Sequence, residues 1–125
     1  MTRIGTPRME TLTNAQGYFD LGLFTDAWET LDGLPVKVRE SSEAMELRLK
    51  ILAATERWEK LEWLAQGLTV STAGWASPWF YLAMGKAKTG HAEGAKEAIR
   101  KLLDLDPDWR LKVLEDPAFE MVCLD

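Results

Sequence analysis

A chain of 125 residues with 46% hydrophobic and 28% charged side chains has the composition of a folded domain, which excludes the polar, highly charged class of disordered chains. Its formal net charge of -5 disfavours binding to nucleic acid or to anionic membranes. The single cysteine, Cys123, excludes an intramolecular disulfide, and no apolar run reaches the roughly 18 residues that span a bilayer. We therefore expect one cytoplasmic domain over residues 1–125, with no membrane partner.

Capping residues and apolar periodicity predict a series of helices. An oxygen-bearing side chain before a proline marks a helix start, because it caps the first turn and proline fits the first helical position. Such pairs stand at Thr6-Pro7, Ser77-Pro78, Asp106-Pro107 and Asp116-Pro117, and Ser41 and Ser42 before Glu43 mark another start. The helices are predicted at 7–21, 25–34, 42–55, 58–69, 78–89, 92–105 and 107–115, with a short turn or helix at 117–122. No segment keeps the two-residue alternation of a strand, so the predicted fold is all-α.

Similar residues recur every 34 positions along these helices. The turn between two helices carries Gly22 and Gly90, which are suited to a positive φ, with Glu56 midway between them. The apolar columns with the same period are Ala15, Leu49 and Ala83; Ala27, Leu61 and Ala95; Leu31, Ala65 and Ile99; and Leu34, Leu68 and Leu102, and Phe24 aligns with Trp58. Such a period predicts stacked helix pairs, because one pair cannot bury its apolar face alone.

The last of these units resembles the tetratricopeptide repeat family. The residues that carry the resemblance are Trp79, Leu82, Ala83, Gly90, Ala95, Ile99, Leu102 and Pro107. The first unit matches through Ala15, Tyr18, Gly22, Phe24, Ala27 and Leu31, whereas the middle one is degenerate. The resemblance implies a right-handed superhelix of three antiparallel helix pairs, at about 8–41, 42–75 and 76–109. A cap at 107–125 would close it with Leu111, Val113, Leu114, Phe119, Met121 and Val122.

The resemblance also implies a concave groove that binds a peptide or helix of a partner protein. In that family the first helix of each pair lines the groove. The matching residues here are Leu12, Gln16, Phe19, Asp20, Glu46, Lys50, Phe80, Met84 and Lys88, together with Ala53, Ala54 and Ala87. Several of them could equally pack between helices. The cations with which some members of the family grip a terminal carboxylate are missing at Leu12, Gln16, Leu47, Ser77 and Tyr81, so chaperone tails are not expected as ligands.

Six tryptophans offer an alternative function, because large rings often anchor interfaces. By the helical count, Trp28 and Trp63 fall near the outward side of a second helix. The alternative to a groove-binding protein is therefore a self-associating structural module such as a homodimer, and the competing interpretation is that these rings pack in or near the core. A catalytic function is not expected, since His91 lies in a turn, Cys123 has no nearby histidine, and no cofactor or metal motif is present.

Overall fold

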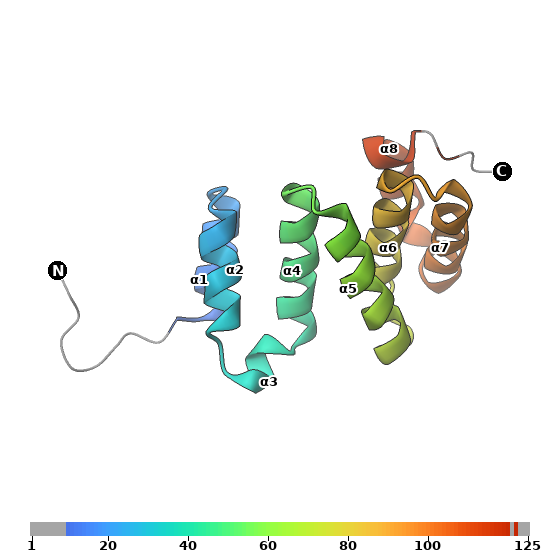
Figure 1. The fold of residues 1–125 in the computed structure, drawn as a ribbon. Coiled ribbons are helices and arrows are strands. Elements are labelled where there is room, and N and C mark those ends of the chain that lie inside the picture. The colour runs from blue at the N-terminus through green and yellow to red at the C-terminus, as the bar shows by residue number, and fades with distance from the viewer. Residues whose placement is uncertain (1–9, 121, 123–125) are drawn as a thin grey trace, which may run out of the picture. The chain divides into compact units, whose positions relative to one another are not determined.

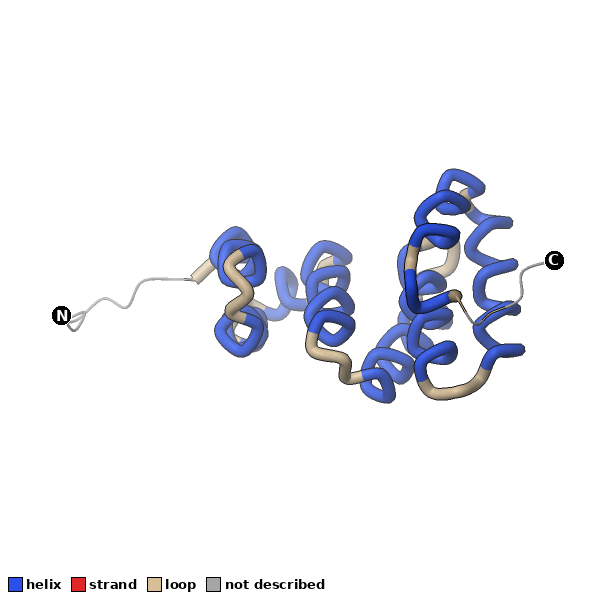
Figure 2. Tube along the Cα trace, turned by 90° about the horizontal axis from the view of Figure 1, so that it is seen from above, coloured by secondary structure: helices blue, strands red, loops and turns tan. Residues whose placement is uncertain are grey.

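The computed structural model describes residues 10–120 and residue 122, and all regular structure within them is helical (Figures 1 and 2). The predicted all-α fold is confirmed for this part of the chain. Two compact units are present, an N-terminal unit over Met1–Ile51 and a C-terminal unit over Leu52–Asp125. That residues 1–125 form one domain stays a prediction.

The N-terminal unit begins with a helix whose start is fixed by a reciprocal cap. The Asn14 backbone N–H donates to the Thr11 hydroxyl at 3.2 Å, and the Thr11 N–H donates to the Asn14 side chain at 2.8 Å. The first helix therefore starts later than predicted, and the pair Thr6-Pro7 lies outside the described residues. The helices of this unit are α1 (Leu12–Asp20), α2 (Phe24–Asp32), α3 (Val36–Arg39) and α4 (Ser42–Ala54), of which α4 runs past the end of the unit.

α3 was not predicted. It forms after Pro35, whose φ of -55° is already close to the helical value, and the Pro35 carbonyl accepts from the Arg39 N–H at 2.8 Å. The start of α4 follows the prediction, because the Ser41 hydroxyl accepts from the Ala44 N–H at 3.2 Å.

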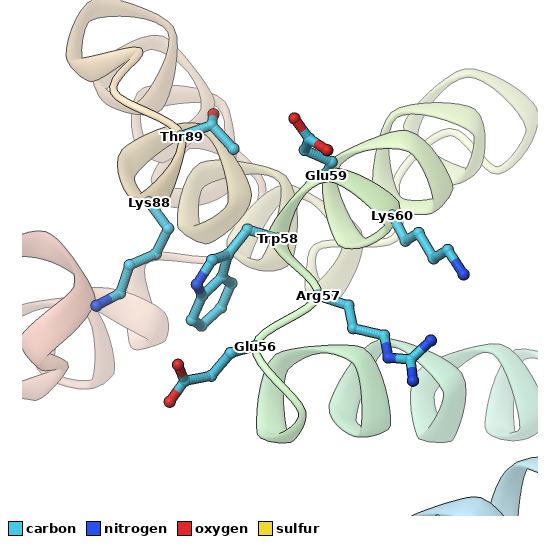
Figure 3. Close-up of a pocket in the computed structure, with 7 residues that line it drawn as sticks. All are labelled: Glu56, Arg57, Trp58, Glu59, Lys60, Lys88 and Thr89. Atoms are coloured by element: carbon cyan, nitrogen blue, oxygen red, sulfur yellow. The ribbon is translucent and has the colours of Figure 1, made fainter.

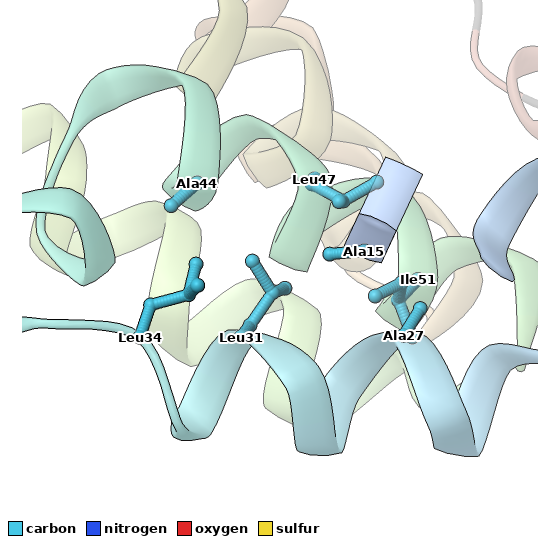
Figure 4. Close-up of a cluster of buried hydrophobic side chains, with 7 residues drawn as sticks. All are labelled: Ala15, Ala27, Leu31, Leu34, Ala44, Leu47 and Ile51. Carbon is cyan, nitrogen blue, oxygen red and sulfur yellow. The ribbon is translucent and has the colours of Figure 1, made fainter. Parts of the chain in front are cut away.

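Small and aliphatic side chains make the core of the N-terminal unit (Figure 4). Ala15 of α1 and Ala27 of α2 are fully buried, and their size lets the two helices approach closely. The remaining buried members come from α2, α4 and the segment between them. The whole cluster is Ala15, Ala27, Leu31, Leu34, Ala44, Leu47 and Ile51.

The C-terminal unit is built from longer helices followed by short ones. α6 packs against both α5 and α7. The helices are α5 (Trp58–Ser71), α6 (Ser77–Lys88), α7 (Ala92–Leu105), η1 (Pro107–Trp109), α8 (Arg110–Glu115) and η2 (Pro117–Phe119). Asp106 and Asp116 cap η1 and η2 as predicted, since their carboxylates accept from the N–H groups of Asp108 and Ala118 at 3.1 and 2.9 Å. The predicted cap at Ser77 is wrong, because α6 includes Ser77 and Ala76 is its N-cap residue.

An aromatic cluster joins α6 to the end of the chain. The ring of Phe80 lies 5.0 Å from that of Trp109, 5.7 Å from that of Phe119 and 5.2 Å from that of Tyr81, measured between centroids. The Lys112 ammonium lies 4.8 Å from the Trp109 centroid and covers the cluster. Residues of the predicted cap therefore do pack onto the last helix pair.

The predicted composition of that cap was right only in part. Val113, Phe119 and Val122 are 2–7% exposed, as expected of capping side chains. Leu111 and Leu114 are 63% and 60% exposed, so they do not close the core. Successive residues of a helix are about 100° apart around its axis, so Leu111 lies on nearly the opposite side of α8 from the buried Val113. Met121 lies outside the described residues.

The turns between paired helices repeat with the predicted period. Gly22, Glu56 and Gly90 have positive φ values of 77°, 57° and 88°. At each turn the next residue donates its N–H to the carbonyl five residues back, and the distances are 2.8 Å for Leu23 to Tyr18, 2.9 Å for Arg57 to Leu52 and 2.8 Å for His91 to Lys86. This is the Schellman motif, in which a left-handed residue ends one helix and the chain starts the next. The second helices accordingly begin at residues 24, 58 and 92.

Three of the four apolar columns of the sequence repeat are buried, whereas in the fourth Leu34 and Leu102 are buried and Leu68 is partly exposed. Ala15, Leu49 and Ala83 are each 0% exposed, and so are Ala27, Leu61 and Ala95. Leu31, Ala65 and Ile99 are at most 1% exposed. Helix geometry alone does not require this agreement, so it supports the alignment of the three segments.

Candidate functional site

The predicted groove residues of the N-terminal unit lie on α1 and α4. Leu12 and Phe19 are partly buried and pack against the unit's core, and the Phe19 ring lies 5.5 Å from that of Phe24. The Gln16 side-chain amide donates to the Asp20 carboxylate at 2.8 Å, one helical turn away. This hydrogen bond holds two polar groups on one face of α1, beside the ring of Phe19.

Glu46 and Lys50 stand one turn apart on α4, and both are partly exposed. The buried residues Ala44, Leu47 and Ile51 of the same helix pack in the cluster with Ala15 of α1. Both helices that carry the predicted residues of this unit are therefore anchored in a common core. Such a scaffold can present side chains of both charge signs next to partly buried apolar ones.

Of the four predicted groove residues on α6, Phe80 and Met84 are buried. Phe80 is 2% exposed because Trp109 and Phe119 pack against its ring. Met84 is 7% exposed. Neither side chain offers contact area to a partner, so their assignment as groove residues is wrong. Lys88 is exposed, and its ammonium lies 5.4 Å from the centroid of the Trp58 ring.

Trp58 lines a broad surface depression of about 630 Å³ that the sequence did not indicate (Figure 3). Glu56 and Lys88 flank the partly exposed ring, whereas Arg57 and Lys60 extend away from it. The full lining is Glu56, Arg57, Trp58, Glu59, Lys60, Lys88 and Thr89. The alignment of Trp58 with Phe24 suggested a position in the core. It gave no indication that part of the Trp58 ring is exposed.

The two tryptophans considered for self-association have different environments. Trp28 is partly buried against the core of the N-terminal unit, and the Arg48 guanidinium lies 4.5 Å from its ring centroid. Arg48 also donates to the Asp32 carboxylate at 2.8 Å. Trp63, in the C-terminal unit, is 80% exposed. The core interpretation therefore fits Trp28, and only Trp63 offers a free ring.

Trp63 belongs to an apolar stripe on α5. Val70, two turns further along the helix, is 77% exposed, and Gly67 lies between the two side chains. A Cβ built on Gly67 would meet no atom within 4 Å, so the helix backbone is open at this point. A large ring beside an uncovered stretch of helix can accept a closely packed partner.

The polar groups around His91 form a structural network. The Thr89 hydroxyl lies 2.9 Å from His91 Nδ1 and 3.2 Å from the Glu62 carboxylate, which also accepts from Lys86 Nζ at 3.2 Å. In a nucleophilic triad the histidine lies between the hydroxyl and the carboxylate, whereas here the hydroxyl is in the middle. This geometry does not activate Thr89 for attack. Cys123 lies outside the described residues.

Two further properties of the described residues bear on function. No cluster of three or more His, Cys, Asp or Glu side chains with the arrangement of a metal site occurs among residues 10–120 and 122. Over the same part of the chain, every helix is too short or too polar to cross a bilayer.

Comparison of the chain with protein-family models, with curated proteins and with solved structures finds no match in any of the three.

Proposed function

We propose that this chain is a tetratricopeptide-type helical repeat protein that binds a peptide or helix of a partner protein. The observation that carries the proposal is the recurrence of one turn geometry at Gly22, Glu56 and Gly90, together with buried columns of the same period. Repeats of this kind favour stacking into a superhelix, and superhelices present extended binding surfaces. The single cysteine is in keeping with a cytoplasmic location, and the proposed function includes no catalysis.

The contact residues that we propose are those of the predicted groove that remain accessible. In the N-terminal unit they are Leu12, Gln16, Phe19 and Asp20 on α1 and Glu46 and Lys50 on α4. The accessible residues Ala53, Ala54, Ala87 and Lys88 belong to the C-terminal unit and stay separate predictions. Partly buried apolar side chains with charges of both signs around them suit a segment that has apolar anchors and polar flanks. Phe80 and Met84 contribute to stability and not to recognition.

Site-specific photo-crosslinking tests this proposal. A benzophenone amino acid placed at Gln16, Asp20 or Lys50 should crosslink one and the same partner from native cell extract, identified by mass spectrometry. Matched positions for comparison are Thr25 and Glu29, which are exposed on α2. Identical products from both sets, or no product from the first set, would count against a binding surface on α1 and α4.

A second candidate function is self-association through α5, and the observation that favours it is the 80% exposure of Trp63 beside Val70 and the open backbone at Gly67. Two copies of α5 could place each Trp63 ring over Gly67 of the other copy, a self-complementary contact of the kind that two-fold dimers use.

Sedimentation velocity at micromolar to high micromolar concentration tests the second candidate. If α5 mediates a dimer, Trp63→Ser should restore a monomer. Val36→Ser is the matched control, because Val36 is also an exposed apolar residue, at 54%, but lies in the other unit. A wild-type chain that stays monomeric throughout would eliminate self-association through this helix.

A further inference from the structure

A groove of about 140 Å³ lies between α7 and α8, and no residue assigned to the proposed groove lines it. Ile99 and Val113 at its base are only 1% and 2% exposed, so the apolar area that a ligand can reach comes from Leu103 and Leu114. Leu103 is partly exposed, and Leu114 is 60% exposed. An apolar cavity of about 150 Å³ holds one benzene molecule, so this groove has room for one bulky apolar side chain.

Three cationic side chains surround these apolar residues. They are Lys96 and Arg100 from α7 and Arg110 from α8. The Lys96 ammonium lies 3.8 Å from the Glu93 carboxylate, a long ion pair with a side chain that is 88% exposed. In the described part of the chain, no salt bridge includes Arg100 or Arg110. A chain with a net charge of -5 thus concentrates positive charge around one small apolar groove.

The contact between α2 and α4 shows which side chains occupy the equivalent repeat positions in the N-terminal unit. Trp28 and Asp32 stand 68 residues before Lys96 and Arg100, which is twice the repeat length. There the following helix supplies Arg48, whose guanidinium stacks 4.5 Å from the Trp28 centroid and bonds the Asp32 carboxylate at 2.8 Å.

At the contact between α7 and α8 the two charges are exchanged, because Arg100 stands in the place of Asp32 and Asp116 in the place of Arg48, 68 residues on. The Asp116 carboxylate accepts from the Ala118 N–H at 2.9 Å, and among the described residues no salt bridge joins it to Arg100. α8 adds a further cation, Arg110, to the lining. The residues that line this groove are thus cationic or apolar, and none of them is acidic.

We propose that this groove binds an acidic peptide segment of a partner protein. A bulky apolar side chain of the segment packs on Leu103 and Leu114, and carboxylates on either side of it pair with Arg100 and Arg110. The planar guanidinium group suits this role, because it donates two parallel hydrogen bonds to one carboxylate. The site shares no residue with the surface on α1 and α4, so the result of its test does not depend on the proposed function.

Fluorescence anisotropy with a defined probe tests the site. The probe is a fluorescein-labelled peptide of sequence Gly-Asp-Glu-Phe-Asp-Glu-Gly, titrated with the full chain at low ionic strength. We expect saturable binding that weakens as salt is added. Replacing the phenylalanine by serine, or the acids by their amides, should each lower the affinity by about tenfold or more, since the proposal needs both the anchor and the carboxylates.

Charge-matched variants separate a specific groove from general attraction. Arg100→Glu with Arg110→Glu should weaken binding by about tenfold or more, whereas Arg57→Glu with Lys60→Glu, the same charge change at exposed positions of the same unit, should change it less than about twofold. Circular dichroism checks the fold, and the milder pair Arg100→Gln and Arg110→Gln replaces the first variant if it unfolds.

Three outcomes would overturn the proposal. They are the absence of saturable peptide binding, an equal loss in both charge variants, and binding to phosphatidylserine vesicles through Arg100 and Arg110 without binding to the peptide. The last result would assign the groove to a lipid surface. Leu114→Ser should lower peptide affinity as well, and its side chain is exposed enough for the fold to tolerate the change.

Discussion

The two units use one local repeat but close their cores with different chemistry. In the N-terminal unit α1 and α2 have nine residues each, and the buried cluster is made of alanine and aliphatic side chains. In the C-terminal unit α5 and α7 have 14 residues each, and an aromatic cluster around Phe80 ties α6 to the end of the chain. The comparison indicates that turn geometry sets the repeat, while local stability depends on what covers each helix pair.

The largest loss of stability is expected from Phe80→Ala. Phe80 is 2% exposed and contacts three aromatic rings, so its removal should cost about 3–5 kcal/mol of unfolding free energy. Urea denaturation gives the total, and amide hydrogen exchange should show lost protection in α6 to α8 with protection kept in α1 and α2. Phe24→Ala is the control from the other unit, where a partly buried ring should cost clearly less. Equal costs would remove the distinction between the two cores.

Gly85 offers a sharper test of helix packing in the C-terminal unit. A Cβ added to it would lie 3.0–3.1 Å from Cβ, Cα and N of Glu62, two of which are backbone atoms that cannot move aside easily. Gly85→Ala should therefore destabilise the unit by about 1–3 kcal/mol in urea denaturation, the usual cost of overpacking. Gly67→Ala is the matched change in open space, and there the higher helix propensity of alanine should stabilise by up to about 1 kcal/mol. A stabilising Gly85→Ala would contradict the close α5–α6 contact.

The repeat and its turns could be predicted from the sequence because they follow from local rules. Apolar columns with a fixed period require burial, and Glu56, which aligns with Gly22 and Gly90, has the positive φ that its place in the repeat implies. Helix starts at Asp106 and Asp116 were equally local. α3 was missed because a single proline signals a turn as readily as a short helix.

The candidate site was harder to predict because exposure depends on residues far along the chain. Periodicity places Phe80 on a face of α6 but cannot tell that Trp109 and Phe119 cover that face. In the same way, the helical count puts both Trp28 and Trp63 on an outward side. It cannot tell that Trp28 packs against the core of its unit and lies under Arg48, whereas Trp63 is 80% exposed.

Two substitutions at the repeated turns should change the free energy of unfolding by smaller amounts and in opposite directions. Gly90→Ala places a side chain at a φ of 88° and should destabilise by about 1–2 kcal/mol. Glu56→Gly relieves the same strain at a φ of 57° and should stabilise by up to about 1 kcal/mol. Thermal and urea denaturation of both variants measure the pair. Two changes of the same sign would mean that the repeated turns are not energetically equivalent.

The smallest change in stability is expected for the contacts of Arg48, which lies between α2 and α4 in the N-terminal unit. Asp32 is 58% exposed, so water and salt screen its pair with Arg48, whereas the guanidinium over Trp28 is shielded, since the Arg48 side chain is only 10% exposed. A double-mutant cycle of Arg48→Met with Trp28→Leu should give a coupling of about 0.5–1 kcal/mol that persists in high salt. The cycle of Arg48→Met with Asp32→Asn should give less, and its coupling should fade as salt is added. If the Asp32 coupling is the larger and survives salt, this contact is held by charge pairing and not by stacking.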